Sequence, residues 1–163
     1  MDTSDSSSTD NMKMIKIASL YGLTDPFFEP SEALEKVYNL KKQAQRELLD
    51  KDLRFLFIVA GVLNLKATPQ TLRNTYTHIN INKRYLKRAA TLYSIAEKGN
   101  LSIQDASKKV YALNDELKAQ GVEKSLRKMT ILASLIDRDT EPYYISKKLN
   151  SIQRMFNYTR EKE

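Results

Sequence analysis

The segment from Asp52 to Leu65 is the most apolar stretch of the chain, and it constrains the fold most strongly. Between Phe55 and Leu63 apolar residues occupy nearly every position, without the alternation typical of a half-buried strand, so the segment is predicted to be a helix. A helix with no polar face must be surrounded by other apolar groups. At 14 residues it is too short to span a bilayer, which takes about 20 apolar residues. The surrounding groups are therefore expected to come from the protein itself, in an all-α fold.

The remaining segments have the spacing of amphipathic helices that could form this surrounding layer. We expect a single compact domain at residues 12–163, with six or seven helices around a central apolar helix at about 53–65. Residues 1–11 are acidic, rich in serine and without an apolar side chain after Met1, so a disordered tail is predicted there. The alternative is an acidic arm that folds back on the basic body and competes with a polyanion.

Several helix starts are marked by residues that can accept hydrogen bonds from the first turn or fit it sterically. Residues 75–82 alternate like a strand but have no partner strand, so we expect an extended loop or the frayed end of the preceding helix. Phe27 and Phe28, in the connection before the first marked start, are expected to fill the core, or else to form an exposed docking site. The starts lie at Ser31, Thr68–Pro69, Asn82, Ser102 with Asp105, and Thr140 with Pro142.

The charge of the chain favours an anionic partner. It has 27 Lys and Arg against 20 Asp and Glu, a net charge of +7. Three of the acids lie in residues 1–11, which hold no basic residue, so residues 12–163 carry 27 basic against 17 acidic residues, a net +10. A body this positive favours nucleic acid, an anionic membrane face or an acidic protein as its partner.

Four cations, Lys83, Arg84, Lys87 and Arg88, lie in the first two turns of a helix predicted at residues 83–98. This is the unfavourable end, because a helix N-terminus already carries partial positive charge. A phosphate bound there would benefit from the four side chains and from the free N–H groups of the first turn. The helix is predicted to turn at Gly99 into another at 102–120, which could be a helix-turn-helix but fits an ordinary helical hairpin better.

Two later helices carry further cations on their polar sides. In the helix predicted at 122–138, Lys124, Arg127 and Lys128 are expected to face outward. In the last helix, Lys147 and Arg154 share a side with tyrosines, a mixture that suits single-stranded nucleic acid but is also common on solvated helix faces.

An apolar stripe on the last helix offers a different interpretation. Its spacings of four, three and four fit either a domain edge or a coiled-coil-like contact with another chain. The chain could then be a helical adaptor or an assembly subunit that self-associates, with its charge serving solubility. The stripe consists of Ile145, Leu149, Ile152 and Phe156.

No combination of residues predicts catalysis, a metal or a cofactor. Cysteine is absent, the only histidine is His78, and the four glycines are isolated, so no thiol chemistry, histidine-based catalysis or glycine-rich phosphate loop is indicated. Asp137, Asp139 and Glu141 alternate, but a calcium loop would need glycine at its sixth position, where Pro142 lies. No signal peptide or membrane span is recognisable, so an intracellular location is expected, whether cytoplasmic, nuclear or inside a virion. No small-molecule substrate is expected.

The leading hypothesis is therefore a non-enzymatic, nucleic-acid-associated protein that binds DNA or RNA phosphates largely without sequence preference. Its expected contacts are Lys83, Arg84, Lys87 and Arg88, helped by Lys124, Arg127, Lys128, Lys147 and Arg154. The alternative is the adaptor or assembly subunit. Replacing the four cations at 83–88 by Gln is expected to weaken binding while leaving thermal stability unchanged or slightly raised.

Overall fold

The computed structural model describes residues 12–96 and 101–162, with side chains up to Phe156. Within these residues the only regular secondary structure is helical, which confirms the predicted fold class. Residues 12–18 form a helix that continues into η1. The predicted tail at 1–11 and the turn at Gly99 lie outside the described residues. The elements are η1 (Ser19–Leu23), α2 (Pro30–Arg46), α3 (Lys51–Val62), α4 (Pro69–His78), α5 (Arg84–Ala96), α6 (Ile103–Ala119), α7 (Lys124–Ala133) and α8 (Pro142–Lys162).

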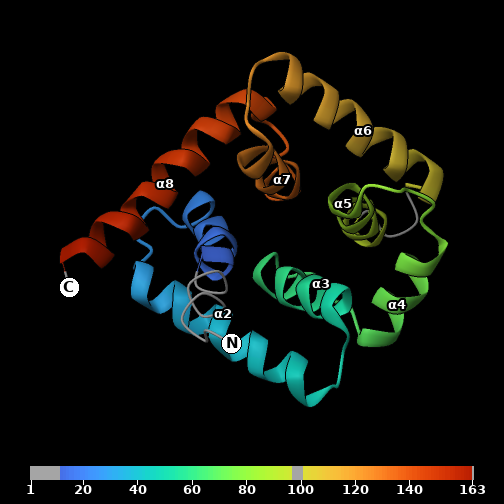
Figure 1. The fold of residues 1–163 in the computed structure, drawn as a ribbon, viewed down its shortest axis with the longest axis horizontal. Helices are drawn as coiled ribbons and strands as arrows, with labels where there is room; N and C mark the ends of the chain where they lie inside the picture. Colours follow the sequence, from blue (N-terminus) through green and yellow to red (C-terminus); the bar gives the residue numbers. More distant parts are fainter. Residues whose placement is uncertain (1–11, 97–100, 163) are drawn as a thin grey trace, which may run out of the picture.

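The helices alternate between an inner and an outer position around a closed ring (Figure 1). Helices α2, α4, α6 and α8 form the four outer sides, whereas residues 12–23, α3, α5 and α7 lie inside and are seen nearly end-on. Each inner helix packs against the outer helix that follows it, and α8 packs against η1, so the two ends of the described chain close the ring. This arrangement places the inner helices next to one another although they are far apart in the sequence.

The predicted central helix is one of four inner helices. Helix α3 packs against α2, α4 and α5, and its Leu56 and Val59 are fully buried. Phe55 and Phe57, however, are only half-buried, and the middle of the ring is not occupied by α3. The expectation of six or seven helices around a central helix at 53–65 is thus slightly wrong. An all-apolar helix can be buried by neighbouring inner and outer helices without lying at the centre of the fold.

The apolar stripe of α8 belongs to the protein's own core. Ile145 and Leu149 are fully buried, Ile152 is 9% exposed and Phe156 is 3% exposed. The ring of Phe156 meets that of Phe28 with 5.8 Å between centroids, and α8 also packs against α7 and η1. The predicted partner interface at these four residues is therefore corrected: their apolar groups are already covered by the helices of the same chain.

Most local predictions of helix starts are confirmed, with small shifts. The side chains of Thr68 and Ser102 each accept a hydrogen bond from the backbone N–H three residues later, so they cap α4 and α6 as predicted. Asp50, which was not among the predicted starts, caps α3 in the same way. Helix α8 begins at Pro142 as predicted. The predicted cap at Ser31 is wrong by two residues, because α2 begins at Pro30 and its N-cap is Glu29, which makes no side-chain cap.

Two predicted segments differ in extent, and one predicted core residue is exposed. Helix α4 runs to His78, and the chain after it is extended, with Ile79 and Ile81 buried, so the alternating segment is part helix and part loop. Helix α7 ends at Ala133, short of the predicted 138. Phe28 is half-buried as expected, but Phe27 is 88% exposed and fills no core.

Candidate nucleic-acid interface

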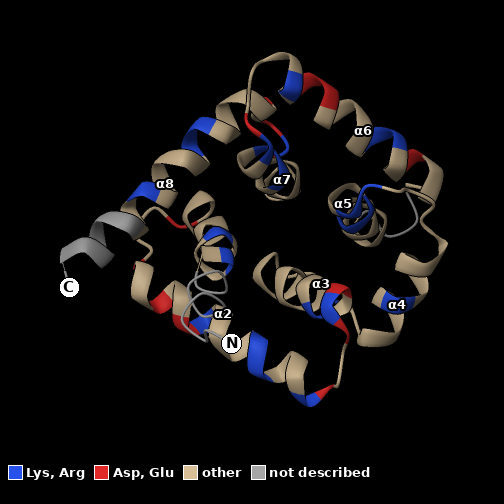
Figure 2. Cartoon of the chain, in the orientation of Figure 1, with Lys and Arg blue, Asp and Glu red and all other residues tan. Residues whose placement is uncertain are grey.

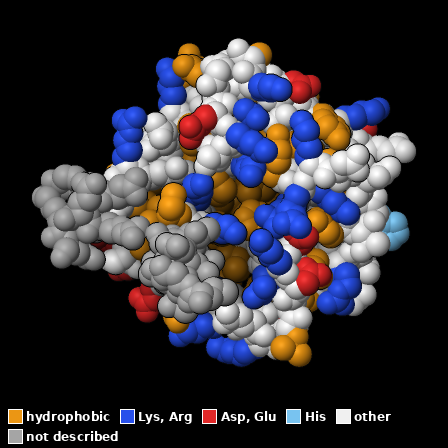
Figure 3. All heavy atoms as spheres, in the orientation of Figure 1, with side chains coloured by type: hydrophobic (Ala, Val, Ile, Leu, Met, Phe, Trp, Pro, Cys, Tyr) orange, Lys and Arg blue, Asp and Glu red, His pale blue; other side chains and the backbone are white. Residues whose placement is uncertain are grey.

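Cations from three inner helices gather on one face of the ring (Figures 2 and 3). Lys128 in α7 lies close enough to Lys13, Lys16, Arg88 and Lys124 for their charges to act on it. Burial first, and then these four positive charges, hold the pKa of Lys128 below its ordinary value. We call this surface the basic face and define it as Lys13, Lys16, Arg84, Lys87, Arg88, Lys124 and Lys128.

The α5 cations are partly neutralised by one acid of the same chain. Arg88 donates to the Asp52 carboxylate from Nη2 at 2.6 Å and from Nε at 3.0 Å, and Arg84 Nε lies 3.3 Å from the same oxygen. Partial burial of Asp52 raises its pKa, but the hydrogen bond and charge of Arg88 lower it by more, so this pKa lies below its usual value. One carboxylate thus faces two guanidinium groups, which leaves a positive excess.

Aromatic rings lie among these cations. The Lys87 ammonium is 4.4 Å from the centroid of the Tyr76 ring, and the Arg88 guanidinium is 4.4 Å from that of Phe55. These are cation–π distances, in which the ring face attracts the positive charge. Lys87 and Arg88 are accordingly half-buried. The second of the two basic turns in α5 therefore packs against α4 and α3 as well as reaching the surface.

Helix α7 contributes two lysines above a ring of α5. Lys124 and Lys128 lie 5.8 Å and 5.4 Å from the centroid of Tyr85. The Tyr85 hydroxyl donates to Asn114 Oδ1 at 2.8 Å, and Arg127 Nε donates to the same oxygen at 2.9 Å. Arg127 also donates to the carbonyl of Val122 and is half-buried. Arg127 therefore joins α7 to α6, and it adds less to the outer surface than the sequence suggested.

Lys13 and Lys16 were missed by the sequence interpretation. Lys16 Nζ donates to Ser125 Oγ in the first turn of α7 at 2.6 Å, across 109 positions of sequence. The spacing of Lys13 and Lys16 predicts that they share a helix face. Nothing in the local sequence indicates that this face lies beside α7. The two helices are neighbours because the ring closes.

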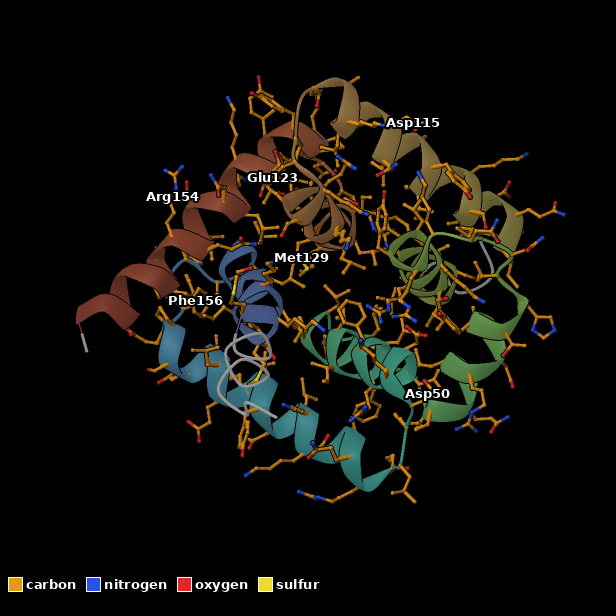
Figure 4. The ribbon with its side chains drawn as sticks, in the orientation of Figure 1. Asp50, Asp115, Glu123, Met129, Arg154 and Phe156 are labelled. Atoms are coloured by element: carbon orange, nitrogen blue, oxygen red, sulfur yellow. The ribbon has the colours of Figure 1, made fainter. Side chains whose placement is uncertain are left out.

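The basic face surrounds a hollow. Figure 3 shows hydrophobic side chains at its floor, in the middle of the ring, with Lys and Arg around them. Met129, labelled in Figure 4, lies at the inner side of α7 and is 5% exposed. Tyr85 and Phe55, which lie under cations of the basic face, are half-buried. The basic face thus combines a charged rim with apolar side chains at the floor of the hollow.

The predicted cations of α8 do not join this surface. Arg154 points outward from the outer helix (Figure 4), and Lys147 lies 4.5 Å from the ring centroid of Tyr143 on the same helix. Of the nine predicted contacts, the structure therefore brings together mainly those of α5 and α7. Lys83, just before α5, is exposed.

The other polar groups considered in the sequence have local structural roles. Asp137 accepts from the backbone N–H of Thr140 and pairs with Lys148 at 3.6 Å. Burial raises its pKa, but the bonds from Thr140 and the charge of Lys148 lower it by more. His78 is exposed, with its Nδ1 2.7 Å from the Asn74 carbonyl.

The described residues offer neither a metal site nor a helix that could span a membrane. Among residues 12–96 and 101–162, no three His, Asp or Glu side chains are grouped so that they could hold a metal ion. In the same ranges, no helix combines the length and the apolar character needed to cross a bilayer. Comparison with family models, with curated proteins and with solved structures finds no match for this chain.

Proposed function

We propose that the protein binds the phosphate backbone of nucleic acid through the basic face, without catalysing a reaction. The observation that carries the proposal is that cations from residues 12–18, α5 and α7 share one surface, where burial and then the charges of four of them lower the pKa of Lys128. Like charges held together destabilise the free protein, and a bound polyanion relieves that repulsion. The proposal rests on this convergence and on the net charge.

Binding by such a face is mainly electrostatic. Phosphates that pair with lysine and arginine release condensed counterions, so affinity falls as salt rises. Within the described residues, Asp52 is the acid that pairs with cations of this face, and the cations with which it pairs are Arg84 and Arg88. The lysines of α7 and of residues 12–18 are therefore the proposed main phosphate contacts, with the α5 arginines beside them.

The test compares two double variants of equal charge change. Lys124→Gln with Lys128→Gln removes two cations of the basic face, whereas Lys147→Gln with Arg154→Gln removes two from α8. Fluorescence anisotropy with a labelled oligonucleotide at several salt concentrations gives the dependence of affinity on salt. The first variant should reduce the slope of log affinity against log salt by about 0.7–0.9 per contact, and the second should change it little. Equal effects of both variants would leave net charge as the sole cause of binding and refute this site.

An adaptor function has one supporting observation, the exposed ring of Phe27. At 88% exposure it is available to another protein, although the apolar stripe of α8 is not. If Phe27 mediates self-association, light scattering should show an oligomer that persists at high salt and is lost in Phe27→Ser. A monomeric wild-type protein in that experiment would argue against self-association through this ring.

A further inference from the structure

We infer that the nucleic acid recognised by the basic face is single-stranded, and that one unstacked base enters the hollow at the middle of the ring. This inference rests on the proposed function and names its substrate class. The reason is the combination of a cationic rim with an apolar floor. A single strand offers both phosphates and free base faces, whereas a duplex keeps its bases stacked inside.

The arrangement of charges matches a strand that crosses a small hollow. The cations come from separate inner helices, and Lys16 of residues 12–18 donates a hydrogen bond to Ser125 of the neighbouring helix α7. Phosphates of neighbouring nucleotides could pair with cations on different sides of the rim. The base between them would then lie above the apolar floor, where burial of its surface is favourable.

Aromatic groups are available to such a base. Tyr85 lies under Lys124 and Lys128, and Phe55 lies under Arg88, so both rings are adjacent to the proposed phosphate contacts. Both residues are half-buried, so part of each remains accessible, and a base that stacks on either ring would displace the cation that lies over it. Stacking of bases on such rings tolerates any sequence, because every base has a flat π face.

Electrostatics alone predicts the opposite preference. A duplex has a higher density of phosphates and releases more counterions per contact, with about 0.9 per phosphate against about 0.7 for a single strand. A face that recognises only charge should therefore bind a duplex at least as tightly. Tighter binding of a single strand requires a contribution from the bases.

The experiment uses the full chain and three fluorescent probes. They are an oligothymidylate, a DNA duplex with the same number of phosphates, and an oligonucleotide of the same length with abasic sites throughout. We expect the oligothymidylate to bind about tenfold more tightly than the abasic strand, the size of one stacked base, and more tightly than the duplex. Equal affinities for oligothymidylate and abasic strand, or a preference for the duplex, would overturn the inference and leave phosphate binding intact. Failure of all three probes to bind would refute the proposed function as well.

A pair of variants tests the ring of Tyr85. Tyr85→Phe and Tyr85→Leu both remove the hydrogen bond to Asn114, and only the second removes the aromatic ring. Tyr85→Leu should lose several-fold more affinity for oligothymidylate than Tyr85→Phe, with equal affinities for the abasic strand. If Tyr85→Leu loses as much affinity for the abasic strand as for the oligothymidylate, the Tyr85 ring contributes to packing alone and does not stack on a base. Circular dichroism checks that both variants fold, and the probe comparison on the wild-type protein does not depend on them.

Discussion

Arg88 of α5 donates two hydrogen bonds to one oxygen of Asp52 in α3, at 2.6 and 3.0 Å, and so joins two inner helices of the ring. The Arg88 side chain is only 16% exposed, whereas that of Arg84, which shares the same carboxylate, is 59% exposed. The two arginines of α5 therefore differ in role. Arg88 joins α5 to α3, and Arg84 remains largely available to solvent.

This difference predicts that replacing Arg88 destabilises the fold more than replacing Arg84. Arg88→Gln should lower the free energy of unfolding by roughly 1–3 kcal/mol, because it leaves a partly buried carboxylate with a weaker partner. Arg84→Gln should cost less than about 1 kcal/mol, since an exposed ion pair contributes little. Urea denaturation of both variants measures the difference. If both variants are as stable as the wild-type protein, the Asp52–Arg88 pair makes no net contribution to stability. The sequence-based expectation of unchanged stability for all four cations implied that result.

The lowered pKa of Asp52 predicts how the contribution of this pair depends on pH. A carboxyl whose pKa is lower in the folded than in the unfolded state stabilises the fold above its unfolded pKa, about 3.9, and this contribution is lost as pH falls through the folded value. Asp52→Asn should therefore be less stable than wild type at pH 7, and the difference should shrink below about pH 4. Urea denaturation at a series of pH values checks this. A difference that stays constant down to the lowest pH would assign the loss to packing instead of charge.

Repulsion within the basic face predicts that the free protein gains stability when a lysine is removed. The pKa of Lys128 is lowered, so its charged form is disfavoured in the folded state, and this cost is present at neutral pH. Lys128→Gln should therefore keep or raise the melting temperature while weakening oligonucleotide binding. The gain should fall with added salt, because the Debye length decreases from about 30 Å at 0.01 M to about 3 Å at 1 M. Lys147→Gln, on α8, is the control, and an equal gain there would contradict the prediction.

The burial of the α8 stripe predicts a folding defect instead of a change in assembly. Leu149→Ala should lower the free energy of unfolding by about 2–5 kcal/mol, as expected for a large-to-small change at a fully buried site. The loss should not depend on protein concentration, since the covering groups come from the same chain. Denaturation at two concentrations tenfold apart tests this. A midpoint that shifts with concentration would return the stripe to an intermolecular contact.

The sequence by itself determined the helical class, most helix starts and the cations at the start of α5. Thr68 and Ser102 cap their helices through bonds that span three residues, so the information lies entirely within the local sequence. The apolar periodicity also identified Ile145 and Leu149 as residues that need covering. These properties depend on backbone geometry and on side-chain spacing along one helix, and both follow from the local sequence.

Only the tertiary structure decided what each helix face meets. The same stripe spacing serves a partner chain or the chain's own core, and ring closure against η1 and α7 selected the core. The Asp52–Arg88 pair joins residues 36 positions apart, and the Lys16–Ser125 bond joins residues 109 apart. The basic face exists because ring closure brings the inner helices together. Helical periodicity fixes the directions of side chains around one axis, whereas the relative placement of axes depends on the packing of the whole core.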